Sequence, residues 1–209
     1  MAVLAVVNFV MFMLFQYYYV GAAPFLKQIG FAERHIMPAM TLGQITELGM
    51  MVALPMLMRR LPIKGLLALG VCSEICRFTC LVIGAPRAVV LLGLACHGSS
   101  IALFMMASLI YLDHRCSPSS RSGAHQLFTI ITMGLAALAG SLIAGRALDF
   151  FAVADGTVTY RLFWMIPGGL AVAALTVLGL FFPGATVQSS EPREASALEE
   201  SGAAGGGTS

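Results

Sequence analysis

Long apolar runs alternate with short polar segments along most of the chain. Six runs carry few charges and are long enough to cross a bilayer, which takes about 20 residues. We expect transmembrane helices at about 3–23, 37–58, 65–84, 88–112, 122–149 and 160–182. The first should stop at Pro24, because proline disrupts a helix interior. The pattern predicts an all-α membrane protein with one six-helix domain over residues 1–183.

Residues 184–209 have a different composition from the rest of the chain. They are mainly small and polar, and include four glutamates and a run of three glycines. Such a segment lacks the apolar side chains needed to form a core. We therefore expect a disordered tail.

The composition narrows the class of protein further. Of 209 residues, 58% are hydrophobic and 11% are charged, whereas soluble domains carry about 25% charged residues. The net charge of +2 is too small to indicate a nucleic-acid partner. The first apolar run has no basic segment before it and no small-residue cleavage site, so we expect a transmembrane helix rather than a signal peptide.

Basic residues in the connections predict the orientation, because cytoplasmic loops are enriched in lysine and arginine. The turns after the second and fourth runs hold Arg59, Arg60, Lys64, Arg115 and Arg121. The turns after the other runs, with the start of the sixth, hold Lys27, Arg34, Arg87 and Arg161. The first group is slightly larger, which favours a cytoplasmic location for both termini and for the tail.

Polar side chains within the apolar runs are the candidate functional residues. Gln44 and Glu47 are three positions apart and share one face of the second helix. A carboxylate at this depth is costly, and such residues mark ion or substrate paths. We therefore expect a buried, functional Glu47. Gln16, in the first run, needs a protein partner or a watery cavity.

Three further features leave two interpretations open. Glu74 and Arg77 form either a structural ion pair on the third helix or a pair whose arginine binds substrate or gates a cavity. His97 is either a satisfied core residue or a donor that lines a cavity. Phe104 either packs in the core or stacks on a ring of the substrate.

The cysteines do not predict a metal site. Cys72, Cys76 and Cys80 recur every four residues on one helix face, and no CxxC spacing is present. Packing is the favoured interpretation and a metal-binding stripe the alternative. None of the four histidines lies in an HExxH motif of the kind that metalloproteases carry. We predict no cofactor.

Several motifs, in chain order, resemble those of nucleoside:proton symporters, a branch of the major facilitator superfamily. The segments similar to the family's eighth helix and following loop are Leu42-Gly43-Gln44-Ile45-Thr46-Glu47 and Arg59-Arg60-Leu61-Pro62-Ile63-Lys64. The segments similar to its ninth to eleventh helices are Arg77-Phe78, Cys96-His97-Gly98, Tyr111-Leu112-Asp113, Arg121-Ser122-Gly123-Ala124-His125-Gln126 and Gly140-Ser141-Leu142-Ile143-Ala144-Gly145 with Asp149.

This resemblance implies the C-terminal six-helix half of a twelve-helix nucleoside transporter in the plasma or inner membrane. Its partner would be a missing N-terminal half or a second copy of the chain. With Phe104 added as the ring-stacking candidate, the implied substrate-binding residues are Gln16, Tyr19, Gln44, Glu47, His97 and Phe104. Tyr19 stands where some members have asparagine. Ala102 stands where some have aspartate, which leaves Glu47 as the proton-coupling candidate.

Other functions fit parts of the pattern. A facilitator for another small solute, such as a sugar or a drug, would share the fold. An inactive six-helix fragment or scaffold would lack the second wall of the cavity. An intramembrane hydrolase would need His97 beside Ser99 or Ser100, which the composition permits without any supporting motif.

Overall fold

The computed structural model describes residues 2–117, 121–154 and 156–182. The tail expected at residues 184–209 lies outside these residues. The helices are α1 (Ala2–Gln28), α2 (Glu33–Arg60), α3 (Ile63–Ile83), α4 (Arg87–Ser100), η1 (Ile101–Met106), α5 (Ala107–Arg115), α6 (Arg121–Thr129), η2 (Ile130–Ala136), α7 (Ala137–Phe150) and α8 (Tyr160–Phe181).

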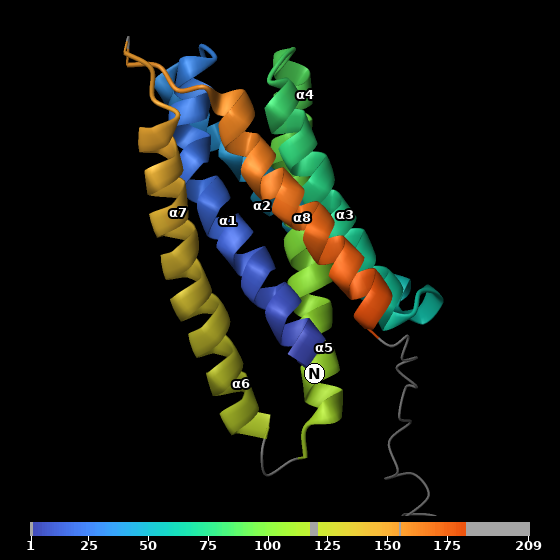
Figure 1. Ribbon diagram of the computed structural model, residues 1–209. Helices are drawn as coiled ribbons and strands as arrows, with labels where there is room; N and C mark the ends of the chain where they lie inside the picture. Colours follow the sequence, from blue (N-terminus) through green and yellow to red (C-terminus); the bar gives the residue numbers. More distant parts are fainter. Residues whose placement is uncertain (1, 118–120, 155, 183–209) are drawn as a thin grey trace, which may run out of the picture.

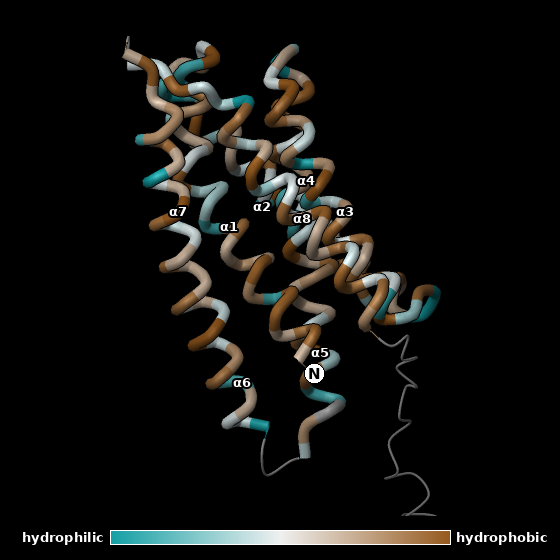
Figure 2. The backbone as a smooth tube through the Cα atoms, in the orientation of Figure 1, coloured by the Kyte–Doolittle hydropathy of each residue, from teal (hydrophilic) through white to brown (hydrophobic). Residues whose placement is uncertain are grey.

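These elements form six membrane-length apolar helices in the described part of the chain, which confirms the predicted fold class. The fourth consists of α4, η1 and α5 and the fifth of α6, η2 and α7; we call them span 4 and span 5. η1 and η2 are π-helical, so each span contains a stretch with wider hydrogen-bond spacing. Figure 2 shows hydrophobic residues along the helices and hydrophilic ones mainly near their ends.

The proline predicted to stop the first helix lies inside α1 instead. The helix runs through Pro24 to Gln28, whose side-chain amide donates to Val158 O and accepts from Val158 N, both at 2.9 Å. This pairing anchors the last turn of α1 to the segment before α8. A bundle tolerates a helix proline when its neighbours hold the surrounding turns. α8 likewise continues through Pro167.

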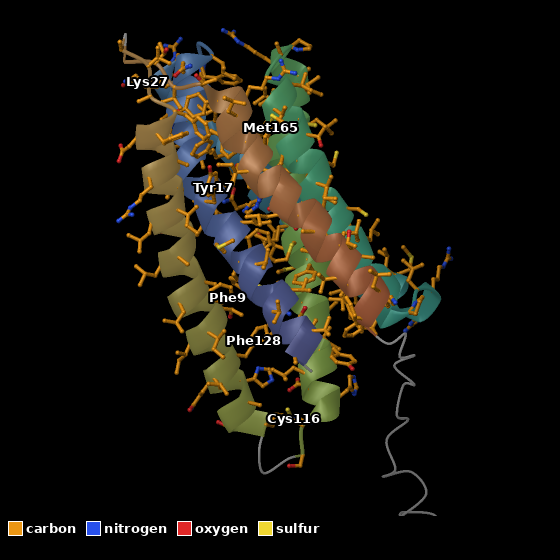
Figure 3. The ribbon with its side chains drawn as sticks, in the orientation of Figure 1. Phe9, Tyr17, Lys27, Cys116, Phe128 and Met165 are labelled. Carbon is orange, nitrogen blue, oxygen red and sulfur yellow. The ribbon has the colours of Figure 1, made fainter. Side chains whose placement is uncertain are left out.

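The connections alternate between the two ends of the bundle, as six crossings require. The α1–α2, α3–α4 and α7–α8 connections lie at one end, and the α2–α3 connection, the end of α5 and the start of α6 lie at the other (Figure 1). The start of α1 and the end of α8 lie at this second end. Figure 3 shows Lys27 and Cys116 at opposite ends of the molecule.

The core forms where α1, α3 and α8 meet. Trp164 and Phe163 of α8 are fully buried beside Phe78 of α3 and Tyr17 of α1, and the Tyr17 hydroxyl donates to Phe163 O at 3.0 Å. On the other side of α1, α7 packs closely because Gly140 leaves no side chain between its backbone and Met13 O. α2 lies at the edge, and Val52 on its outer face is 83% exposed.

Candidate functional site

A glycine crossing places α2 against span 4. A Cβ atom on Gly98 would collide with the backbone oxygen of Gly43 and the backbone nitrogen of Glu47, so the two helices touch through their main chains. Thr46 Oγ1 adds a hydrogen bond to Ala95 O at 2.6 Å. The crossing fixes the positions of Gln44 and Glu47 relative to His97, whose ring lies beside Gly43.

A chain of polar side chains crosses the bundle interior from α3 to α1. The guanidinium of Arg77 donates to Glu74 Oε1 through Nη2 and hydrogen bonds to His97 Nδ1 through Nη1. His97 Nε2 is 2.7 Å from the hydroxyl of Tyr19. Glu74, Arg77 and His97 are buried, whereas Tyr19 is 41% exposed. The ion pair expected between Glu74 and Arg77 is present.

Aromatic rings surround the buried guanidinium. Its central carbon lies 4.3 Å from the ring centroid of Tyr18, 4.8 Å from that of Phe78 and 5.6 Å from that of Phe15. Cation–π attraction of about 2 kcal/mol or more at a desolvated site offsets part of the penalty for burying the charge. Arg77 is thus held by a carboxylate, an imidazole and three rings, which fixes its position.

Tyr19 belongs to a groove on one side of α1. The groove has a volume of about 240 Å³, and the residues that line it are Phe12, Phe15, Gln16, Tyr19, Ile101, Met105, Met133 and Ala137. They come from α1, both π-helical segments and the first residue of α7. π-Helical stretches within α-helices are frequent at functional sites. The groove contains two predicted site residues, Gln16 and Tyr19.

Gln44 and Glu47 lie on α2 and do not line this groove. Gln44 is exposed and Glu47 is half-buried, so the expectation of a buried carboxylate is wrong for this chain by itself. The reason is that α2 packs on span 4 through its glycine side. The side chain of Glu47 makes no hydrogen bond within the described residues, but it interacts electrostatically with Tyr19.

Two further predicted binding residues, Phe104 and His97, also do not line the groove. Phe104 is fully buried, and its backbone and Cβ pack against Gly70 of α3, which places its ring in the core. His97 is 2% exposed and lies behind Tyr19, with its ring against Phe15 and Tyr18. Both residues follow the packing interpretation, although His97 reaches the groove through its bond to Tyr19.

Most residues of the groove carry no functional signal in the sequence. Phe12, Phe15, Met105 and Met133 look like ordinary core residues in an apolar run, and no sequence signal marks the π-helical segments. Among the cysteines, Cys76 Sγ lies 3.7 Å from Cys96 Sγ, which joins α3 to span 4. No group of three potential metal ligands occurs within the described residues.

Comparisons with known proteins identify the family. The family model described as "Nucleoside H+ symporter" matches residues 1–186. YegT of Escherichia coli (strain K12) is 28% identical over 185 residues, covering 84% of this chain and 43% of that protein. The xanthosine permease of the same organism is 25% identical over 137 residues, covering 64% of this chain and 32% of the permease.

A solved structure supports the fold assignment independently. The crystal structure of a mutant of the nucleoside transporter NupG has a TM-score of 0.73 to this chain at 19% identity, covering 86% of this chain and 48% of that one. The chain spans less than half the length of the curated relatives. The family is one of transporters rather than enzymes. The six membrane-length apolar helices in the described part of this chain indicate a multi-pass membrane protein. The chain belongs to the nucleoside H+ symporter family.

Proposed function

We propose that this chain is one half of a proton-coupled nucleoside transporter in the plasma or inner membrane, with both ends of the chain in the cytoplasm. The observation that carries the proposal is the groove beside α1, where Gln16 and Tyr19 stand among apolar and aromatic side chains. Sites for small molecules combine mostly apolar walls with a few polar groups that fix orientation.

The size of the groove supports its assignment as half of a site. Its volume of about 240 Å³ falls below the roughly 300–1,000 Å³ of typical small-molecule pockets. Transporters of this architecture hold their substrate near the midplane, between two repeats. An N-terminal six-helix half, or a second copy of the chain, would supply the opposite wall.

In this proposal Gln16 and Tyr19 contact the nucleoside directly, and Gln44 and Glu47 reach it from α2. Glu47 is the proton-coupling candidate, because its half-buried carboxylate makes no hydrogen bond within the described residues. Ala102 on span 4 offers no carboxylate. Phe104 is left out because its ring is in the core, and His97 acts through Tyr19.

The test is uptake of tritiated uridine and adenosine by proteoliposomes that contain the chain, with and without a co-reconstituted N-terminal half from a relative. We expect uptake driven by an inward proton gradient and competition by either unlabelled nucleoside. If a sugar or a drug blocks uptake and nucleosides do not, the substrate is that other solute instead of a nucleoside. No uptake or nucleoside binding in either preparation would favour an inactive fragment.

The role of Glu47 is tested separately with Glu47→Gln. This variant should insert normally and lose gradient-driven uptake, because the amide cannot take up and release a proton. Glu47→Asp, which keeps a carboxylate able to take up and release a proton at this position, serves as the control. Gradient-driven uptake by Glu47→Gln at the wild-type rate would exclude this carboxylate.

A further inference from the structure

The hydrogen bonds around His97 determine which of its ring nitrogens carries the proton. Arginine is always charged and has donors only, so Nη1 of Arg77 must donate to His97 Nδ1. Nδ1 therefore carries no proton. A neutral imidazole protonates its other nitrogen, so the proton is on Nε2, and that nitrogen donates to the Tyr19 hydroxyl 2.7 Å away.

The same reasoning extends to Tyr19. Its oxygen accepts from His97, and its own O–H remains available to donate. No acceptor for that proton is found among the described residues. The half-exposed Tyr19 side chain also lines the groove, where a ligand can meet it.

We infer that Arg77 holds His97 as the neutral tautomer protonated on Nε2, and that this histidine makes the Tyr19 hydroxyl a hydrogen-bond donor to an acceptor atom of a nucleoside in the groove. The inference rests on the proposed function for the identity of the ligand. Arg77 and His97 are positioning residues, and of these three residues only Tyr19 touches the substrate. The required feature of the ligand is an oxygen or unprotonated nitrogen.

The other titratable groups near His97 are compatible with a proton on Nε2. On α3, Glu74 neutralises Arg77 without touching the histidine, since its hydrogen bond goes to Nη2. On α1, Tyr18 stacks beside the imidazole with ring centroids 4.9 Å apart. On α2, Glu47 is within electrostatic range of Tyr19 without forming a hydrogen bond to it in the described residues. None of these groups offers an acceptor to Nδ1.

The tautomer can be read directly by nitrogen NMR of the four histidine rings in nanodiscs near neutral pH, with His97→Gln used to assign the signal. We expect His97 Nε2 to carry the proton and Nδ1 to give the shift of an unprotonated nitrogen. A protonated Nδ1, in either the neutral or the charged ring, would overturn the inference. The measurement needs no ligand, so it is independent of the proposed function.

The donor role is tested by equilibrium binding of tritiated uridine. Tyr19→Phe should weaken binding about three- to tenfold, which is the loss expected for one hydrogen bond between uncharged groups. Replacement of Tyr19 by 3-fluorotyrosine, whose hydroxyl is a stronger donor and a weaker acceptor, should leave binding equal or tighter. Weaker binding with the fluorinated residue would mean that Tyr19 accepts, and would refute the inference.

A double-mutant cycle tests whether His97 acts through Tyr19. His97→Phe keeps a ring against Phe15 and should weaken uridine binding by itself, yet add little in the Tyr19→Phe background. Fully additive losses would show that His97 works independently. If neither uridine nor adenosine binds to the wild-type chain, with or without the co-reconstituted N-terminal half, the proposed function fails, and with it the ligand assigned to Tyr19. The NMR spectrum still decides the tautomer.

Discussion

Span 4 meets the main chain of α2 at Gly98, so this glycine is an informative place for a small perturbation. Gly98→Ala adds one methyl group, which would meet the Gly43 carbonyl oxygen, the Glu47 backbone nitrogen and the Thr46 hydroxyl. Two of these three atoms belong to the main chain and cannot rotate away. The substitution must therefore push α2 off span 4.

The size of the effect follows from the packing. Adding a methyl group to a well-packed interior destabilises by about 1–3 kcal/mol. For a chain of this length, 1 kcal/mol changes the melting temperature by about 2–4 °C. We expect Gly98→Ala to lower the Tm by roughly 2–12 °C. Displacement of α2 should also move Glu47 and weaken uridine binding.

Gly49→Ala is the matched control. Gly49 lies on α2, the helix that Gly98 of span 4 contacts, and a Cβ atom at Gly49 has no neighbour within 4 Å. Alanine in place of a helical glycine stabilises by about 0.5–1 kcal/mol, so this variant should melt at the same or a slightly higher temperature. Trp164, the one tryptophan in the sequence, is fully buried and reports unfolding by fluorescence. Equal melting temperatures for the two variants would refute the glycine crossing.

Three further predictions test other parts of the structure. Arg77→Gln should lower the free energy of unfolding by about 3–5 kcal/mol, measured by thermal unfolding, because it leaves the buried Glu74 carboxylate without a counter-ion. Lys27→Gln is the control: it breaks an exposed pair with Glu33 and should leave the Tm unchanged. Copper-phenanthroline should oxidise Cys76 and Cys96 to a disulfide, which maleimide titration detects as a loss of two thiols. The variant Cys76→Ser should prevent this loss. If the wild-type chain loses no thiols, the packing of α3 on span 4 is contradicted. Gly140→Ala should destabilise the contact of α7 with Met13 and lower the Tm, whereas Gly145→Ala, whose added methyl group meets nothing within 4 Å, should not. A lower Tm for Gly145→Ala than for Gly140→Ala would contradict this packing of α7 on α1.

The hydrophobic pattern was sufficient to predict the six membrane-length helices of the described residues. It failed at Pro24, because the tendency of proline to end a helix is local, whereas the bonds between Gln28 and Val158 that secure the last turn of α1 join residues far apart in sequence. The π-helical segments were also missed. Their residues are apolar and helix-compatible, so nothing in the sequence of η1 or η2 separates them from an α-helix.

Prediction of the site was similarly uneven. The spacing of Glu74 and Arg77 revealed an ion pair because both residues lie on one helix. The link from Arg77 through His97 to Tyr19 joins three helices, so no spacing within one helix could indicate it. The apolar neighbours of Glu47 in sequence predict that it is buried. The burial of a helix face depends on what packs against it, however, and α2 lies at the edge of the bundle.

We propose that a nucleoside occupies the groove beside α1 and reaches Glu47 of α2. Protection from a thiol reagent tests it most directly, with Gln16→Cys, Glu47→Cys and His35→Cys introduced singly into a chain whose native cysteines are replaced. We expect uridine to slow labelling at positions 16 and 47 and to leave labelling at the exposed position 35 unchanged. If uridine slows labelling at none of the three positions, the nucleoside does not occupy this groove.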